Sequence, residues 1–197
     1  MLKRLMDILI SVLMLVIGSP FFLLVSGLIK LTDGGPVFFK QTRVGLNGKL
    51  FQMLKFRSMV IDAEKEKDAL LEKYLKQGGI TFKLENDPRV TWIGRWLRKS
   101  SVDEMPQLWN VIKGEMSLVG PRPPLPYEVL KYGPLERKRL GAKPGLTCLW
   151  QVNGRSDLSF SHQVLLDIAY INNRSFRLDV EILMRTIPVV LTGRGAY

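Results

Sequence analysis

Two adjacent carboxylates, Asp103 and Glu104, stand in a part of the chain that is otherwise rich in cations. Arg98 and Lys99 precede them, and Arg122 follows between two prolines. The whole chain has 29 Lys and Arg against 18 Asp and Glu, a formal net charge of +11. A carboxylate pair in such surroundings indicates chemistry on an anionic substrate, because clustered cations attract anionic ligands.

The same pair has a structural explanation. Ser101-Val102-Asp103-Glu104 matches a capping box, in which Glu104 would satisfy the backbone N–H of Ser101. Pro106 counts against it, because a helix capped by Ser101 would lose a hydrogen bond at this proline. A helix that starts nearer Asp103 avoids that cost and places both carboxylates where its dipole favours their ionised forms. Neighbouring helical residues point roughly a quarter-turn apart, so one carboxylate could attack as a nucleophile while the other holds a cation.

Further cations suit phosphate. Lys55-Phe56-Arg57-Ser58 ends a strand-like run with alternating cations, and Arg122 lies in a stiff Pro121-Arg122-Pro123 turn. Arginine favours bidentate phosphate contacts and lysine a point-charge contact, although each alone is more often a surface charge. The sequence has no Walker-type lysine loop and no dinucleotide fingerprint. Its single histidine, His162, and single cysteine, Cys148, exclude a multi-histidine or Cys/His metal site and an internal disulfide.

The N-terminal segment is apolar. Ile8 to Ile29 contains no charged residue and is about long enough to span a bilayer core. A single-pass helix or an uncleaved signal sequence would explain such a run, whereas no cleavage site indicates a cleaved signal. Ser19-Pro20 interrupts the run near its middle: Pro20 should kink the helix, and Ser19 can bond a freed carbonyl.

Charge then favours one topology. Lys3 and Arg4 precede the run, and Lys30, Lys40 and Arg43 follow it, so both ends carry charge typical of the cytoplasmic side. A re-entrant helix that dips into one leaflet, breaks at Ser19-Pro20 and returns satisfies both ends better than a full span.

The rest of the chain predicts an α+β fold, mainly helical with a small β-hairpin or sheet. Thr32–Pro36 is a breaker cluster, and the runs Val37–Phe39 and Leu50–Leu54 flank a turn at Gly45–Gly48, which predicts a hairpin. Further along we expect helices at Ile61–Gln77, Val90–Lys99, Tyr127–Leu140, Phe160–Asn172 and Leu178–Leu191, turns or loops at Lys143–Thr147 and Asn153–Ser156, and a strand at Leu149–Val152.

The Val90–Lys99 helix is amphipathic. Trp92 and Trp96 fall on its apolar face, whereas Arg95 and Arg98 lie around the other. Tryptophan opposite cations suits the headgroup layer of a membrane, and anionic lipid is the partner that this face and the net charge indicate. An amphipathic core helix is nearly as compatible with the pattern.

Short motifs in order along the chain match a known family. They are Lys3-Arg4 with Asp7, Ser19-Pro20, Asp33–Pro36, Gln41–Gly45, Lys55–Met59, Asn86–Arg89, Asp103-Glu104 with Pro106–Leu108, Ser117–Pro123, Lys143–Thr147 and Trp150–Arg155. On these motifs the chain resembles, essentially end to end, the bacterial monotopic phosphoglycosyl transferases, or "bacterial sugar transferases". The ending Gly195-Ala196-Tyr197 looks closest to their hexose-1-phosphate branch, which includes galactosyl-phosphate transferases.

The resemblance implies a membrane anchor at residues 1–31 and a cytosolic catalytic domain at residues 32–197. It implies Asp103 as nucleophile and Glu104 as its acidic partner, the two holding Mg²⁺. Around the substrate phosphates it implies Lys55, Arg57, Arg98, Arg122 and Arg155. Cys148 departs from the family, where glycine is common. Many relatives carry extra spanning helices and a further domain at the N-terminus, so we expect either a naturally short enzyme or a trimmed chain.

The implied reaction moves a hexose 1-phosphate, of galactose or glucose type, from a UDP-sugar to polyprenyl (undecaprenyl) phosphate and releases UMP. It would proceed through a covalent aspartyl phosphosugar on the cytosolic face of the bacterial inner membrane, as a first membrane step of exopolysaccharide, O-antigen or related glycoconjugate synthesis. A homodimer is compatible with the resemblance, and no nucleic-acid partner is expected. The alternative class is a non-catalytic membrane-anchored adaptor or basic tether, which would not need an Asp-Glu pair beside a rigid arginine turn.

Overall fold

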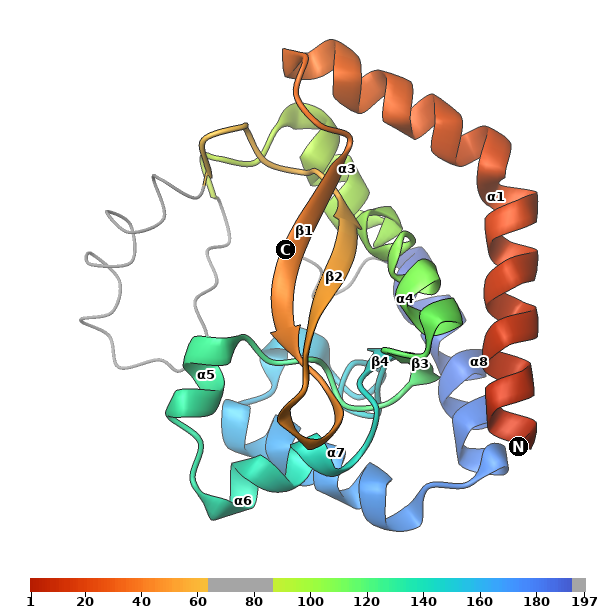
Figure 1. Ribbon diagram of the computed structural model, residues 1–197, viewed down its shortest axis with the longest axis vertical. Coiled ribbons are helices and arrows are strands. Elements are labelled where there is room, and N and C mark those ends of the chain that lie inside the picture. The colour runs from red at the N-terminus through yellow and green to blue at the C-terminus, as the bar shows by residue number, and fades with distance from the viewer. Residues whose placement is uncertain (64–86, 193–197) are drawn as a thin grey trace.

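A long N-terminal helix runs along one side of the other elements in the computed structural model, which describes residues 1–63 and 87–192 (Figure 1). This helix, α1 (Leu2–Asp33), is long and apolar enough to cross a membrane by length and composition. Only 11% of its most apolar window is buried by the rest of the chain. The helix therefore presents most of its apolar surface outward.

The proline in α1 bends the helix without ending it. Helical structure continues through Ser19 and Pro20, and Figure 1 shows the bend. Pro20 has no N–H to donate to the Val16 carbonyl, which lies four residues earlier. Ser19 Oγ donates to that carbonyl at 2.8 Å. The predicted kink and the predicted role of Ser19 are confirmed, although the element is one continuous helix.

Both ends of α1 dock on the same body. Near its C-terminal end, Val25 and Ile29 are buried in an apolar cluster with Phe56, Ile93 and Leu97. Near its N-terminal end, its buried positions are Asp7 and Ser11. The apolar side chains between these two contacts are largely exposed, as at Leu13, Ile17 and Leu23. Contacts with the rest of the protein therefore hold both ends of α1, and its middle is left largely uncovered.

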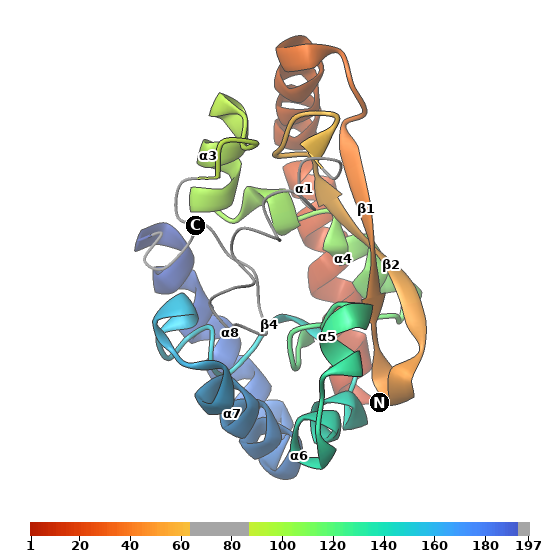
Figure 2. The ribbon, with the colours of Figure 1, turned by 90° about the vertical axis from the view of Figure 1, so that its left-hand side faces the viewer.

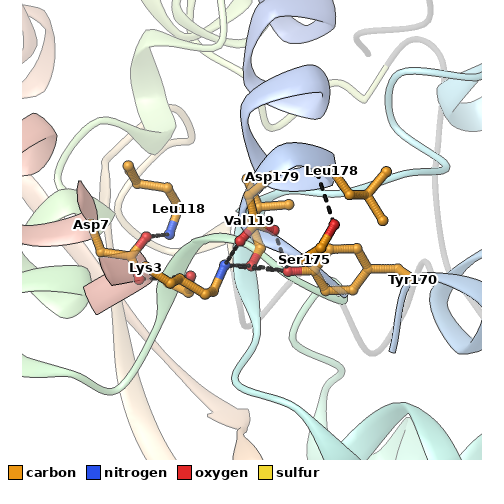
Figure 3. A network of polar contacts seen from close by, with 9 residues as sticks. Lys3, Asp7, Leu118, Val119, Tyr170, Ser175, Leu178 and Asp179 are labelled. Atoms are coloured by element: carbon orange, nitrogen blue, oxygen red, sulfur yellow. Dashed lines mark hydrogen bonds and ion pairs between the residues drawn. The ribbon is translucent and has the colours of Figure 1, made fainter. Parts of the chain in front are cut away.

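A polar network fixes the first turns of α1 (Figure 3). Asp7 accepts from Ser117 Oγ at 2.9 Å and from the Leu118 backbone N–H at 3.1 Å. Lys3 donates to the Val119 carbonyl at 3.1 Å and pairs with Asp179 at 2.7 Å. These contacts join the anchor to the strand that leads into the Arg122 turn.

The predicted hairpin is confirmed, with longer strands than expected. β1 (Phe38–Val44) pairs antiparallel with β2 (Leu50–Phe56), and the 3₁₀ turn η1 (Leu46–Gly48) joins them. Phe39 lies opposite Lys55, and Arg43 lies opposite Phe51. Because side chains alternate between the faces of a strand, Gln41, Arg43 and Lys55 share one face of the hairpin.

A second, parallel pair of strands was not predicted. β3 (Ser117–Val119) pairs with β4 (Gly145–Thr147), where we expected a turn. A Cβ on Gly145 would lie 2.1 Å from the Gly120 nitrogen, so these two backbone segments can approach each other only because both residues are glycines. The predicted strand at Leu149–Val152 is wrong, since those residues form turns.

The predicted Tyr127–Leu140 helix is also wrong as one element. It forms α5 (Pro126–Leu130), α6 (Pro134–Arg137) and the 3₁₀ turn η4 (Lys138–Gly141), because Gly133-Pro134 interrupts it. The predicted helices at Val90–Lys99, Phe160–Asn172 and Leu178–Leu191 are confirmed as α3 (Trp92–Lys99), α7 (Phe160–Asn173) and α8 (Phe176–Thr192). Most of the predicted Ile61–Gln77 helix and the Gly195–Tyr197 ending lie outside the described residues.

The main core lies between the hairpin, α4 (Gln107–Lys113), β3 and the two C-terminal helices. Leu108, Val111 and Ile182 are fully buried in it. Figure 2 shows α7 and α8 facing α1 and the hairpin across the molecule, with α3 at the opposite end from α6. The α+β prediction is therefore confirmed.

The docking of both ends of α1 predicts the outcome of labelling in intact membranes. Cysteines replacing Leu2 and Lys40 in separate variants should react with an impermeant maleimide from the same face of the bilayer, because both flank a helix that returns. Leu13→Cys, on the exposed middle of α1, should react from neither face. Wild type measures the background from the buried Cys148. Labelling of the two flanking cysteines from opposite faces would contradict the re-entrant topology.

Candidate active site

Asp103 and Glu104 lie in a 3₁₀ turn before a helix, not at the start of the helix itself. The turn is η3 (Val102–Glu104), and α4 begins only after Pro106, its N-cap residue. Ser101 adopts a left-handed conformation with φ 57° and makes no side-chain cap. The Glu104 carboxylate contacts Lys55 instead of the Ser101 backbone. The capping-box explanation is therefore excluded.

Lys55, near the end of β2, brings the two carboxylates together. Its Nζ donates to Glu104 Oε1 at 2.8 Å and lies 3.5 Å from Asp103 Oδ2. Arg122, from the Pro121-Arg122-Pro123 turn, also approaches this Glu104 oxygen, and its Nη1 lies 3.7 Å away. Asp103 is buried, with 6% of its surface exposed. One cation thus serves both acids, and a second reinforces Glu104.

The pKa values of the two acids are shifted in opposite directions. Burial raises the pKa of Asp103, and the Glu104 charge adds to this effect against the opposing pull of Lys55 and Arg98. Burial would also raise the pKa of Glu104, but Lys55 and Arg122 outweigh it and lower that pKa to about 2. We expected a helix dipole to favour ionisation of both, which is wrong for Asp103 because it is buried and precedes the helix. Glu104 is the permanent anion, and Asp103 is the more basic carboxylate.

The Arg122 turn is held in place by β1. The buried Arg43 guanidinium donates from Nη1 to the Pro123 carbonyl at 2.9 Å and from Nη2 to Gln41 Oε1 at 2.6 Å. The Val44 backbone N–H donates to the Pro124 carbonyl at 3.0 Å. Burial, with Arg122 nearby, lowers the pKa of Arg43 to about 10. These contacts fix the direction from which Arg122 reaches Glu104.

The other predicted cations divide into two groups. Arg98, in the last turn of α3, donates to Ser58 Oγ at 3.0 Å and is an electrostatic neighbour of Asp103. Arg155 has φ 50° and is an electrostatic neighbour of Glu104. Arg57 differs, because it pairs with Asp33 at the end of α1. Arg98 and Arg155 therefore flank the acids, whereas Arg57 mainly ties the anchor to β2.

A single cavity of about 730 Å³ joins these residues. Its lining includes all of the predicted site residues outside the membrane break: Lys55, Arg57, Arg98, Asp103, Glu104, Arg122 and Arg155. Ser19 and Pro20 are exposed on α1 and contribute nothing to it. A cavity of this volume falls within the usual range for small-molecule sites, about 300–1,000 Å³.

The donor set fits magnesium held jointly with a substrate. Across residues 1–63 and 87–192, no group of three or more His, Cys, Asp or Glu side chains could hold a metal. Mg²⁺ commonly binds through one or two carboxylates plus substrate phosphates and waters. Asp103 and Glu104 supply those two carboxylates, so a metal here would depend on the phosphates for its remaining ligands.

Sequence reasoning missed two kinds of cavity residue. Gln41 and Arg43 belong to the Gln41–Gly45 motif and line the cavity. The alternation of side chains along the predicted hairpin could have placed them on the same face as Lys55. Tyr132, Arg139 and Phe160 also line the cavity. Tyr132 and Arg139 lie in the interrupted α5–α6 region and Phe160 lies at the start of α7. No local sequence pattern predicted that these two segments would be in contact.

The family model described as "Bacterial sugar transferase" matches residues 1–193. The galactosyl transferase CpsE of Streptococcus agalactiae is 47% identical over 197 residues, covering 98% of this chain and 43% of that protein. The exopolysaccharide production protein ExoY of Sinorhizobium fredii is 44% identical over 202 residues, 99% of this chain and 88% of that protein. The undecaprenyl-phosphate galactose phosphotransferase of Salmonella typhimurium is 45% identical over 204 residues, 100% of this chain and 42% of that protein. The chain thus spans less than half the length of two of these relatives and most of the third.

The lowered pKa of Glu104 predicts how the free energy of unfolding depends on Lys55 and on pH. Because the folded pKa of Glu104 is depressed to about 2, its pairing with Lys55 stabilises the fold above the unfolded pKa of about 4.3 and is lost as pH falls toward 2. Lys55→Met should therefore lower the free energy of unfolding by about 1.5–3 kcal/mol at pH 7, and the difference from wild type should shrink between pH 5 and pH 3.

Thermal unfolding in detergent at several pH values measures this difference. Lys40→Met is the matched control, since Lys40 is exposed on the other face of the same hairpin. A Lys55→Met difference that stays constant with pH would show that the ion pair with Glu104 contributes no stability.

Proposed function

The chain belongs to the bacterial sugar transferase family, and we propose that it transfers a hexose 1-phosphate from a UDP-sugar to polyprenyl phosphate and releases UMP. Two relatives are named as undecaprenyl-phosphate sugar phosphotransferases, one for galactose and one for glucose. Another is named as a UDP-galactose-lipid carrier transferase. These names support the donor, the acceptor and the hexose class proposed for this chain.

One observation carries the mechanism: a buried carboxylate of raised pKa lies beside a carboxylate that the same lysine keeps ionised. A carboxylate with a raised pKa is a stronger base once ionised, and so a better nucleophile. The Glu104 side chain already accepts from Lys55, so it is held as a fixed anion rather than freed for attack. We therefore assign nucleophilic attack to Asp103, whereas Glu104 takes no part in the attack and helps Asp103 to hold a cation.

The reaction then proceeds in two balanced displacements. An Asp103 oxygen attacks the sugar-bearing phosphorus, the bond from that phosphorus to the bridging oxygen breaks, and UMP leaves with the electron pair. An oxygen of polyprenyl phosphate next attacks the same phosphorus and restores the Asp103 carboxylate. Lys55, Arg122 and Arg155 lie where they can neutralise charge on the phosphates. Mg²⁺ held by Asp103 and Glu104 would, when bound, offset the repulsion between anionic reactants.

The proposed location is the cytosolic face of a bacterial inner membrane. The docking of both ends of α1 supports a re-entrant anchor, and Trp92 and Trp96 of α3 are exposed, 64% and 46%. Exposed tryptophans beside cations suit an interface with anionic lipid. Such a location would bring the cavity to the level at which a lipid phosphate and a cytosolic nucleotide sugar can both reach Asp103. A homodimer stays a prediction.

Intact-mass spectrometry tests the proposal. Protein incubated with UDP-galactose or UDP-glucose, without polyprenyl phosphate, should gain the mass of one hexose phosphate and release UMP. Asp103→Asn should abolish both, because an amide is not a competent nucleophile. Asp157→Asn, at an exposed aspartate outside the cavity lining, should retain both. An adduct on Asp103→Asn would contradict the assignment, and absence of UMP release from wild type with either sugar would contradict the proposed donor class.

A further inference from the structure

The cavity has two chemically different ends. At the end beside the anchor, the Phe38 ring stacks on Phe56 with centroids 5.4 Å apart, and Phe56 packs on Phe22 of α1 at 6.0 Å. At the other end, Tyr132, Arg139, Phe160 and Gln163 line the cavity; we call these four residues the α7 end. Figures 1 and 2 both place α3 and the start of β1 at one end of the hairpin, and α5 and α7 toward the other.

A buried ion pair builds the α7 end. Arg139 donates from Nε to Asp167 Oδ2 at 2.7 Å, and its Nη2 lies 2.7 Å from the same oxygen. Its Nη1 donates to the Tyr132 hydroxyl at 3.0 Å. The guanidinium carbon lies 5.9 Å from the Tyr132 ring centroid and 5.7 Å from that of Phe160. Arg139 thus holds two aromatic rings in fixed positions at the cavity wall.

The α7 end also offers one donor and one acceptor. The Tyr132 oxygen accepts from Arg139, so its own hydrogen can be donated to a ligand. Burial raises the pKa of Tyr132 to about 12, which keeps that hydrogen in place at neutral pH. Gln163 donates from Nε2 to the Leu158 carbonyl at 2.9 Å, and its Oε1 accepts from no donor among the described residues.

We propose that the α7 end binds the uracil of the donor nucleotide, an inference that rests on the proposed function. Uracil presents an N3–H donor between two carbonyl acceptors on a flat ring. Gln163 Oε1 would accept from N3–H, the Tyr132 hydroxyl would donate to a carbonyl, and the half-buried Phe160 ring would stack on the base. The α7 end therefore offers the donor, the acceptor and the aromatic ring that a uracil base can use.

The positions of the reacting groups favour uracil over the hexose at this end. The hexose is bonded to the phosphate that Asp103 attacks, so it must lie beside Asp103. A second phosphate and a ribose separate the uracil from that phosphorus, so the base reaches farther along the cavity. Asp103 has Arg98 of α3 as a neighbour, whereas Glu104 has Arg122 and Arg155. The nucleophile thus faces the anchor end, and the base extends away from it.

The same arrangement separates the two substrates. Polyprenyl phosphate must reach the phosphorus from the membrane, and the aromatic contacts Phe22, Phe56 and Phe38 lead from α1 to that end of the cavity. UMP bound at the α7 end can leave without crossing the path of the lipid. One site can then serve a cytosolic donor and a membrane acceptor in turn.

Product binding and donor kinetics test the assignment. Phe160→Ala should raise the UMP dissociation constant and the KM for the UDP-sugar together, by about 5- to 150-fold, the range that base stacking on one aromatic ring supplies. The KM for polyprenyl phosphate should not change. Phe176→Ala is the matched control, because Phe176 is an exposed aromatic at the start of α8, outside the cavity lining. If circular dichroism shows that Phe160→Ala does not fold, Phe160→Leu keeps apolar bulk and should still weaken UMP binding.

Gln163 has a separate readout. Wild type should prefer UMP to N3-methyl-UMP, and Gln163→Ala should lose that preference. Two results for Phe160→Ala would overturn the proposal. One is a rise in the donor KM with an unchanged UMP dissociation constant, which would place the hexose at the α7 end. The other is no change in either the donor KM or the UMP dissociation constant. Wild type that binds UMP with these dependences but transfers no sugar phosphate would refute the proposed function and leave the uracil site standing.

Discussion

The ammonium of Lys55 permits two neighbouring carboxylates to lie together in a largely buried site. It is 2.8 Å from Glu104 and 3.5 Å from Asp103, and unpaired charges in such surroundings would be strongly unfavourable. Its position depends on β2, which is held by the buried Asn110 of α4. Asn110 accepts from the Leu54 N–H at 3.0 Å and donates to the Gln52 carbonyl at 2.7 Å. Because α4 directly follows the Asp103-Glu104 turn, this one side chain joins the lysine strand to the acid turn.

The anchor is part of the same construction. Asp7 and Lys3 bond to β3, and β3 runs into the Pro121-Arg122-Pro123 turn that β1 holds from the other side. The membrane helix and the cation that approaches Glu104 therefore share one short strand. This explains why an apolar helix with few buried positions carries buried polar contacts at its start.

Local patterns were sufficient for the elements with strong periodicity or clear breakers. The hairpin, α3, α7, α8, the bend at Pro20 and the acid pair beside cations were all predicted. The β3–β4 pair was not, because two three-residue strands joined across a long sequence separation carry little local signal. The split of the predicted Tyr127–Leu140 helix could have been predicted, because Gly133-Pro134 is a strong helix breaker. The raised pKa of Asp103 depends on burial by distant segments, and the role of Arg57 at Asp33 depends on where α1 ends, so neither could follow from spacing.

The central claim is that Asp103 carries the phosphosugar between two separate displacements. The most direct measurement is exchange of labelled UMP into UDP-sugar in the complete absence of polyprenyl phosphate. A covalent intermediate requires that the first displacement run in both directions without the acceptor, so label should enter UDP-sugar with wild type and not with Asp103→Asn. No exchange with wild type until polyprenyl phosphate is added would contradict the covalent mechanism and indicate direct transfer in a ternary complex.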